Sequence, residues 1–193
     1  MKTNLENKSL IPIDDGACDH LVGLRMPDVN LLSTDGCEIN LRTLTESLAV
    51  IFFYPATGVP GRDPAVDPAP GWDFIPGAAG CTAQACSFRD LYAELKSLGA
   101  KIIGISTQLA EEQKEFLNRK SIPFALASDS SLLAMKALNL PVFQVGDRAF
   151  IKRLTLIVEK EIIKKVFYPV YPTERNAEEV LIWLQNQYTT DMI

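Results

Sequence analysis

The chain has 193 residues, of which 47% are hydrophobic and 22% are charged, a composition typical of a globular protein with a full core. Its net charge is −5 and its basic residues form no block, which argues against nucleic acid as the main partner. No apolar run reaches the roughly 18–20 residues that cross a bilayer, and the first residues lack the apolar stretch of a secretion signal. The single histidine, His20, excludes sites that need two histidine ligands, and we expect neither a metal nor a cofactor. These features predict a cytoplasmic protein with a single domain over residues 1–193.

The N-terminal part predicts a leader, a hairpin and a buried strand. We expect residues 1–22 to form an irregular leader. Short alternating runs then flank the turn signal Asp35-Gly36, which predicts an N-terminal β-hairpin. Residues 49–54 are continuously apolar, as is typical of a strand buried on both faces of a sheet.

Residues 56–79 are rich in proline and glycine, and six of the 12 prolines lie from Pro55 to Pro76. Because such a stretch holds neither a regular helix nor a sheet ladder, we predict a long loop. Long loops inside compact domains tend to be functional. Trp72 and Phe74 have two interpretations here. In the first they have a functional role, covering a reactive sulfur or lining a pocket. In the second they only anchor the loop on the core.

The rest of the chain alternates between helix and strand patterns. Apolar residues recur at spacings of three and four from Cys81 until Gly99, which predicts one helix ended by a glycine. Further predicted elements are a strand at 101–106, a polar helix at 110–120, a helix at 131–138, a strand at 154–158 with a hairpin partner at 161–167, and a C-terminal helix. Phe143 and Val145 are assigned to a second loop that faces the same site. This order predicts an α/β fold with a central mixed β-sheet flanked by helices.

Cys81 is a candidate nucleophile because Gly80-Cys81 leads directly into the first of these helices. Unpaired backbone N–H groups and the positive end of the helix dipole favour a thiolate in the first turn. A thiolate is the form that attacks a disulfide or a peroxide. The alternative is that Cys81 is only a small residue where the chain meets the helix.

Cys86 follows five residues later on the same predicted helix. That spacing is a rise of about 7.5 Å, and it separates the two Cα atoms beyond the disulfide limit of about 7 Å. A redox role for the pair therefore requires the first turn or two of the helix to unwind. Cys18 and Cys37 are interpreted as bystanders, because four cysteines are too sparse for a disulfide scaffold.

Several short segments are individually weak signals but become specific in their order and spacing. They are Met26-Pro27-Asp28, Phe53-Tyr54-Pro55, Gly80-Cys81-Thr82-Ala83-Gln84-Ala85-Cys86-Ser87-Phe88-Arg89-Asp90, Gly104-Ile105-Ser106 and Arg153-Leu154-Thr155-Leu156-Ile157. Together they resemble a peroxiredoxin of the bacterioferritin-comigratory, or Q, type, from about Gly23 to the C-terminus. The resemblance implies a thioredoxin-like fold and the thiol-dependent reduction of hydrogen peroxide or organic hydroperoxides.

The resemblance also implies a role for each site residue. Cys81 is the peroxidatic cysteine that becomes a sulfenic acid, and Cys86 is the resolving cysteine that forms an intramolecular disulfide with it. Arg153 matches the active-site arginine that stabilises the thiolate and polarises the peroxide, and Pro55 shields the sulfur. A thioredoxin-like protein then reduces the disulfide. The alternative for Arg153 is a strand-edge residue in a surface ion pair.

Two positions depart from the family pattern, which usually has proline seven residues and threonine three residues before the cysteine. Those positions hold Phe74 and Ala78, and a long insertion after Pro55 explains both changes. Ala78 has no hydroxyl to hydrogen-bond the thiolate and the peroxide. We hypothesise that Thr57 returns from the near end of the loop to supply it, with Thr82 as a weaker substitute.

Two other functions compete with the enzyme. One is a thiol–disulfide redox sensor or exchange protein, and the other is a degenerate thioredoxin-like binding module that uses its proline-rich loop as the contact surface. Turnover with a thioredoxin system distinguishes the enzyme from both. For the enzyme we expect a hydroperoxide substrate, a thioredoxin-like reductant, no nucleic-acid or membrane partner, and a monomer or weak homodimer.

Overall fold

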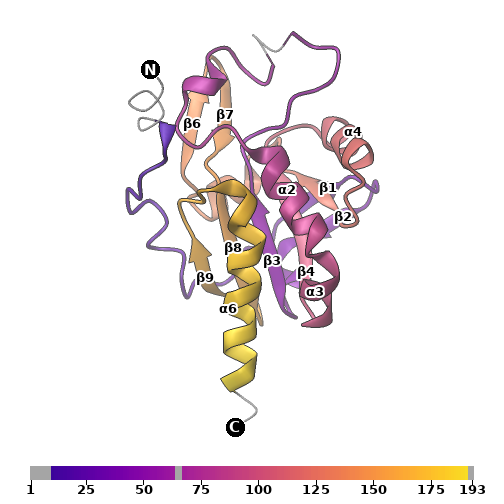
Figure 1. Ribbon diagram of the computed structural model, residues 1–193, viewed down its shortest axis with the longest axis vertical. Coiled ribbons are helices and arrows are strands. Elements are labelled where there is room, and N and C mark those ends of the chain that lie inside the picture. Colours follow the sequence, from indigo (N-terminus) through magenta and orange to yellow (C-terminus); the bar gives the residue numbers. More distant parts are fainter. Residues whose placement is uncertain (1–9, 64–66, 191–193) are drawn as a thin grey trace, which may run out of the picture.

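The computed structural model describes residues 10–63 and 67–190, with the backbone alone for 188–190. A mixed sheet in the order β2-β1-β5-β4-β3-β8-β9 forms its centre, and β6 pairs with β7 in a separate hairpin (Figure 1). The strands are β1 (Asn30–Ser33), β2 (Glu38–Asn40), β3 (Ala49–Phe53), β4 (Lys101–Ser106), β5 (Leu126–Ser128), β6 (Val142–Val145), β7 (Arg148–Ile151), β8 (Leu154–Glu159) and β9 (Ile162–Phe167). The helices are α1 (Leu41–Leu44), α2 (Cys81–Asp90), α3 (Tyr92–Ser97), α4 (Ala110–Lys120), α5 (Leu133–Ala137) and α6 (Asn176–Thr190), with 3₁₀ turns η2 (Trp72–Phe74) and η3 (Thr173–Arg175). None of the helices in the described ranges is long and apolar enough to cross a membrane.

β3 is the central strand that carries the chain toward the site. It runs parallel to β4 and antiparallel to β8, and all five of its residues are buried. Val50 and Phe52 belong to the core under α2, α3, α4 and α6, where the Phe52 ring stacks on Phe88 with centroids 4.6 Å apart. Ile51 and Phe53 face the opposite core, under α1 and α5. The prediction of a strand buried on both faces is therefore confirmed, and Figure 1 shows α2, α3 and α6 on one side of the sheet.

The N-terminal hairpin is also confirmed, because β1 and β2 pair antiparallel around Asp35-Gly36. The helix expected from Cys81 to Gly99 is instead two helices, α2 and α3, separated at Leu91. Leu91 has φ −103° and ψ 15°, which lies outside helical geometry and ends the first helix. The apolar periodicity continues across the break, so periodicity alone did not reveal it.

The assignment of Phe143 and Val145 to a loop was wrong. Both residues lie in β6, which pairs antiparallel with β7 and places Phe143 opposite Phe150. Their rings stack with centroids 5.5 Å apart, and such cross-strand aromatic pairs stabilise a two-stranded ribbon. The short three-residue strand β5 was also not predicted; it is held between β4 and β1.

The described parts of the leader and of the long loop both pack against this framework. Residues 10–22 form turns, and Cys18 and Leu21 bury their side chains in the core under α1 and α5; residues 1–9 of the predicted leader lie outside the described residues. The predicted loop at 56–79, described except for 64–66, contains only the short turn η2 as regular structure in its described part. An Arg62–Glu112 ion pair at 2.6 Å ties the loop to α4.

Candidate active site

Cys81 is the first residue of α2, as the sequence pattern predicted, and it is 4% exposed. Gly80 precedes it at φ +98°, a conformation that side chains rarely adopt, and a Cβ there would lie 2.5 Å from Thr173 Oγ1. Glycine is therefore required at the point where the loop turns into the helix. The turn places the Cys81 sulfur beside the positive end of the α2 dipole, which favours negative charge.

Arg153 holds its guanidinium against the same sulfur. It lies between β7 and β8, is 3% exposed, and its Nη2 donates to Cys81 Sγ at 3.2 Å. The same nitrogen donates to the carbonyls of Ala78 at 3.1 Å and Ala79 at 3.0 Å, so the segment before α2 wraps around the cation. Among the ion pairs of the described residues none includes Arg153, so the surface ion-pair alternative was wrong. A buried cation without a carboxylate is stabilised by a thiolate next to it.

A chain of buried polar side chains supports Arg153 from behind. Arg153 Nη1 donates to Gln84 Oε1 at 2.6 Å, and Gln84 Nε2 donates to Asn176 Oδ1 at 2.9 Å. Thr155 Oγ1 donates to the same Asn176 oxygen at 2.7 Å. Sequence reasoning missed this chain. Gln84 had a signal, since it stands three residues after Cys81 on one helix face, but nothing in the sequence links it to Asn176 at the start of α6.

Cys86 lies on α2 as predicted and is half-buried. The helix is continuous from Cys81 to Asp90, and both cysteines are free thiols. Because an intact helix keeps Cα atoms five residues apart by about 7.5 Å of rise, the structure corresponds to the reduced arrangement of the pair.

Among the hydrogen bonds of the described residues, none joins Thr57 to Cys81. The backbone N–H and the hydroxyl of Thr57 donate to Gln108 Oε1 at 2.8 and 3.2 Å, and its carbonyl accepts from Gln108 Nε2 at 2.9 Å. The hypothesis that Thr57 replaces the missing hydroxyl is therefore not supported, because Gln108 already engages that group. Thr82 is exposed and makes no side-chain cap of α2, and Pro55 is buried two residues after the end of β3.

Ala78 and Tyr54 complete the surroundings of the sulfur. Ala78 is fully buried, and its carbonyl accepts from the Cys81 thiol at 3.5 Å as well as from Arg153. Tyr54, in the same buried cluster as Cys81, has its pKa raised above the usual range by burial, with the charge of Cys81 adding to the effect. Tyr54 thus stays protonated at neutral pH and cannot act as a base.

The two loop aromatics lie in different environments. Trp72 is 8% exposed and packs edge-on against Phe150 at 5.1 Å and tilted against Phe143 at 5.6 Å. Phe74 is 81% exposed. Trp72 therefore anchors the loop on the β6–β7 hairpin, whereas Phe74 contributes neither to that anchor nor to the covering of the sulfur.

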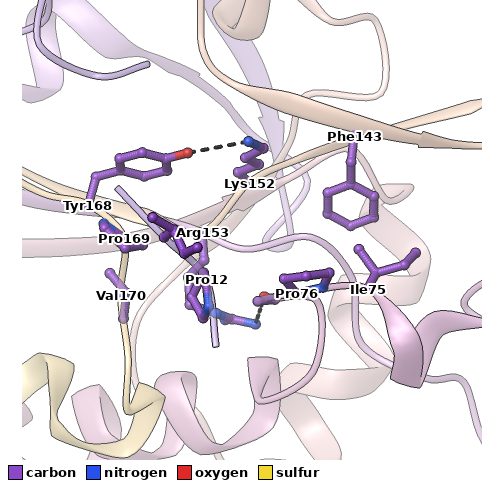
Figure 2. A pocket seen from close by; sticks show the side chains of 11 residues that line it. Pro12, Ile75, Pro76, Phe143, Lys152, Arg153, Tyr168, Pro169 and Val170 are labelled. Atoms are coloured by element: carbon purple, nitrogen blue, oxygen red, sulfur yellow. Dashed lines mark hydrogen bonds between the residues drawn. The ribbon is translucent and has the colours of Figure 1, made fainter. Parts of the chain in front are cut away.

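An apolar cavity of about 210 Å³ lies beside Arg153 (Figure 2). Figure 2 shows Phe143 and Ile75 at one end and Pro169 and Val170 at the other, with Arg153 between them. The remaining lining residues are Pro12, Ile13, Pro76, Gly77, Lys152 and Tyr168. The site thus combines a cation that contacts the sulfur with an apolar space next to it.

The leader forms one wall of this cavity and is held by Asp15. Lys152 Nζ donates to Asp15 Oδ2 at 2.7 Å, and the Tyr168 hydroxyl donates to Asp15 Oδ1 at 2.8 Å. These bonds, that from Lys152 first, lower the pKa of Asp15 to about 2. We call this group of three residues the Asp15 clasp.

The other two cysteines and the histidine lie away from this chemistry. Cys18 is buried, and burial, with the nearby Asp15 and Asp14 charges, raises its pKa to about 12, which keeps it an unreactive thiol at neutral pH. Cys37 is exposed in the turn after β1. The ring of His20 is hydrogen-bonded to the Leu138 carbonyl at 2.9 Å.

Comparison with known proteins identifies the relatives of this chain. The sequence profile of the Redoxin family matches residues 21–181. Peroxiredoxin Q, chloroplastic, from Oryza sativa subsp. japonica is 30% identical over 165 residues, which are 85% of this chain and 66% of that protein. The protein of the same description from Sedum lineare is 28% identical over 165 residues, covering 85% of this chain and 77% of that protein. The chain thus spans slightly less than two thirds of the rice relative.

Solved structures show the same fold. The crystal structure of peroxidoxin BcpB from Mycobacterium tuberculosis has a TM-score of 0.69 at 24% identity and covers 86% of this chain and 96% of that one. A mutant of PrxQ from Xylella fastidiosa has a TM-score of 0.69 at 20% identity over the same shares. The predicted thioredoxin-like α/β fold is confirmed. The matched family profile, together with the relatives described as peroxiredoxin Q, shows that the chain belongs to the redoxin family and within it to the peroxiredoxin Q type.

Proposed function

We propose that this protein is a thiol-dependent peroxidase that reduces hydrogen peroxide or organic hydroperoxides through Cys81. The observation that carries the proposal is the 3.2 Å contact between Cys81 Sγ and the buried guanidinium of Arg153. A thiolate there has a fixed cation beside it, and the same cation faces the charge that develops when a peroxide bond breaks.

In the first step the Cys81 thiolate attacks one peroxide oxygen. An S–O bond forms and the O–O bond breaks, so the sulfur is oxidised to a sulfenic acid and the leaving oxygen takes up a proton as water or an alcohol. Arg153 Nε is buried and has no hydrogen-bond partner among the described residues, so it is available to donate to a peroxide oxygen. Apolar groups of an organic hydroperoxide fit the cavity beside Arg153.

In the second step the Cys86 thiol attacks the sulfenic acid. An S–S bond forms and water leaves, and a thioredoxin-like dithiol protein then reduces the disulfide to two thiols. Because α2 separates the cysteines, its first turns must unwind, and the Gln84 bonds to Arg153 and Asn176 must break. The state with the helix intact is thus the form that reacts with peroxide.

The setting of this reaction is part of the proposal. Four free cysteines and a reaction that starts from a reduced thiol support a reducing compartment such as the cytoplasm. The net charge of −5 supports a function without nucleic acid or a membrane, and we propose a monomer or weak homodimer. We further propose that residues 1–193 act as one domain and that 56–79 are an insertion in the family framework, which Trp72 anchors.

The test is the second-order rate of the reduced protein with hydrogen peroxide, compared for wild type, Cys81→Ser and the exposed-cysteine control Cys37→Ser. We expect a rate well above that of a free thiol in wild type and Cys37→Ser and its loss in Cys81→Ser, because the thiolate is the nucleophile. Mass mapping of the wild-type product should show a Cys81–Cys86 bridge. A wild-type rate equal to that of a free thiol, with both hydrogen peroxide and an organic hydroperoxide, would refute the proposal.

One observation favours a second function, a redox sensor. Ala78 offers no hydroxyl near the sulfur, so a slow peroxide step is compatible with an otherwise intact cysteine pair. A sensor forms the Cys81–Cys86 bridge but does not cycle efficiently. Multiple turnovers with thioredoxin, thioredoxin reductase and NADPH distinguish the enzyme from the sensor.

A further inference from the structure

Asn176 is the last member of the polar chain that ends at the Cys81 sulfur. It is fully buried at the start of α6, and so are Gln84 on α2 and Thr155 on β8. Its Oδ1 accepts two hydrogen bonds, from Gln84 Nε2 at 2.9 Å and from Thr155 Oγ1 at 2.7 Å. Asn176 thereby joins the C-terminal helix to the helix that carries both cysteines.

The direction of every bond in this chain follows from Arg153. A guanidinium has only donors, so Gln84 must turn its Oε1 toward Arg153 and its Nε2 away from it. The Gln84 Nε2 donor then needs an acceptor on its other side, and Asn176 Oδ1 accepts at 2.9 Å, closer than Thr155 Oγ1 at 3.5 Å. Reversal of the Gln84 amide would bring a donor against a donor, so Arg153 and Asn176 hold that amide from its two ends.

This arrangement leaves Asn176 Nδ2 without a partner. That nitrogen is buried and makes no hydrogen bond with the described residues. A buried unpaired amide N–H destabilises a folded protein, so Asn176 is not the residue that stability alone would favour here. The Asn176 side chain instead supplies its carbonyl oxygen, Oδ1, as an acceptor for Gln84 and Thr155.

We propose that Asn176 is a positioning residue of the active site. By accepting from Gln84, it holds the Gln84 carbonyl on Arg153 Nη1, and this bond directs Arg153 Nη2 at Cys81 Sγ. Asn176 thus acts on the Cys81 sulfur through Arg153 without touching the sulfur. The proposal rests on the proposed function for its effect on peroxide rates, but its effect on the thiol does not depend on that function.

The test compares Asn176→Ala with wild type by two measurements. The first is the pH profile of iodoacetamide alkylation at Cys81, mapped by mass spectrometry, and the second is the rate with hydrogen peroxide. Without Asn176 the Gln84 Nε2 keeps only its longer bond to Thr155 Oγ1 at 3.5 Å, so the Gln84 amide, and with it Arg153, is held less firmly. We expect the midpoint of alkylation to move to higher pH and the peroxide rate to fall about tenfold, as for loss of a hydrogen bond in a charged network.

A control variant distinguishes positioning from loss of stability. Val180→Ala removes a fully buried side chain one turn further along α6 and leaves the polar chain intact. It should lower the melting temperature as much as Asn176→Ala does, or more, with an unchanged alkylation midpoint. If Asn176→Ala lowers the melting temperature and leaves the midpoint where it is in wild type, Asn176 is only structural and the proposal is wrong.

A double-mutant cycle with Gln84 tests the route of the effect. In a Gln84→Met background the link to Arg153 is already broken, so Asn176→Ala should cause no further shift of the alkylation midpoint. Additive shifts from the two substitutions would contradict the proposed chain. If wild type fails to react with peroxide while the midpoint still moves in Asn176→Ala, the proposed function fails and the positioning role stands.

Discussion

Arg153 is buried without a carboxylate partner among the described residues, and its charge is met by backbone carbonyls and by the Cys81 sulfur. Burying an unpaired charge is costly, and these contacts compensate part of that cost. Lysine would not replace it, because only the planar guanidinium reaches the sulfur, the carbonyls and Gln84 from fixed directions. The proposed reaction thus depends on one side chain that bonds in several directions.

Thr57 gives a prediction at the residue scale. We expect Thr57→Val to leave the second-order rate with hydrogen peroxide within about twofold of wild type and to lower stability by about 1 kcal/mol, because its hydroxyl bonds to buried Gln108 and not to the sulfur. Stopped-flow rates and urea unfolding of both proteins measure the two effects. A tenfold loss of rate at unchanged stability would restore Thr57 as the substitute for the hydroxyl that Ala78 lacks.

Residue types and their spacing along the chain were sufficient to single out Cys81 and Cys86 as candidates, and the resemblance to the family added Arg153. They were not sufficient for Thr57, because the direction of a hydroxyl depends on which acceptor the tertiary structure places next to it. Here that acceptor is Gln108, in the segment after β4. Asn176 was not predicted for a similar reason. Its link to Gln84 exists only because α6 packs against α2.

At the scale of elements, α2 has two requirements that oppose each other. Intact, it holds Cys81 at its N-terminus against Arg153, and unwound, it allows Cys81 and Cys86 to bond. Gln84 lies between the cysteines and is anchored to Arg153 and Asn176, so the unwinding that joins the cysteines also releases Arg153 from its support. In the proposed cycle, oxidation therefore breaks the contacts that position Arg153 at the site, and reduction restores them.

Hydrogen exchange tests whether oxidation unwinds the first turns of α2. After one equivalent of hydrogen peroxide, we expect protection of the amides at residues 84–86 to fall at least about tenfold in wild type, because the first turns of α2 have unwound. In Cys86→Ser the same amides should keep their protection, since no intramolecular bridge forms. Equal protection in oxidised and reduced wild type would mean that the cysteines do not bond to each other.

At the scale of the whole molecule, residues 10–22 of the predicted leader are part of the folded structure. Cys18 and Leu21 are buried in the core, and the Asp15 clasp fixes the segment beside the cavity next to Arg153. Pro12 contributes to the cavity wall and lies close to Gly77, where an added Cβ would be 3.2 Å from its ring. Distant parts of the chain thus shape the space next to the reactive cysteine.

The Asp15 clasp predicts a specific pH dependence. The folded pKa of Asp15 is about 2, below its ordinary value of 3.8, so the clasp stabilises the fold above about pH 4 and loses this effect as pH falls toward 2. The Asp15 side chain is 45% exposed, so we expect a contribution of less than about 1 kcal/mol. The melting-temperature difference between wild type and Asp15→Asn should be constant from pH 7 to 5 and shrink below pH 4. A difference that persists unchanged to the lowest pH at which both proteins fold would contradict the prediction.

The sequence by itself determined the alternation of strands and helices, the N-terminal hairpin, the buried strand β3 and the family, because these depend on local periodicity and on motifs that are contiguous in the chain. It did not determine the break between α2 and α3 or the β6–β7 hairpin. Nor did it determine that Trp72 is buried and Phe74 exposed. All of these depend on packing between distant segments. Only the tertiary structure decided which polar atoms meet. Hydrogen bonds such as that from Gln84 to Asn176 require atoms from separate elements to lie within about 3 Å, and no local pattern specifies that distance.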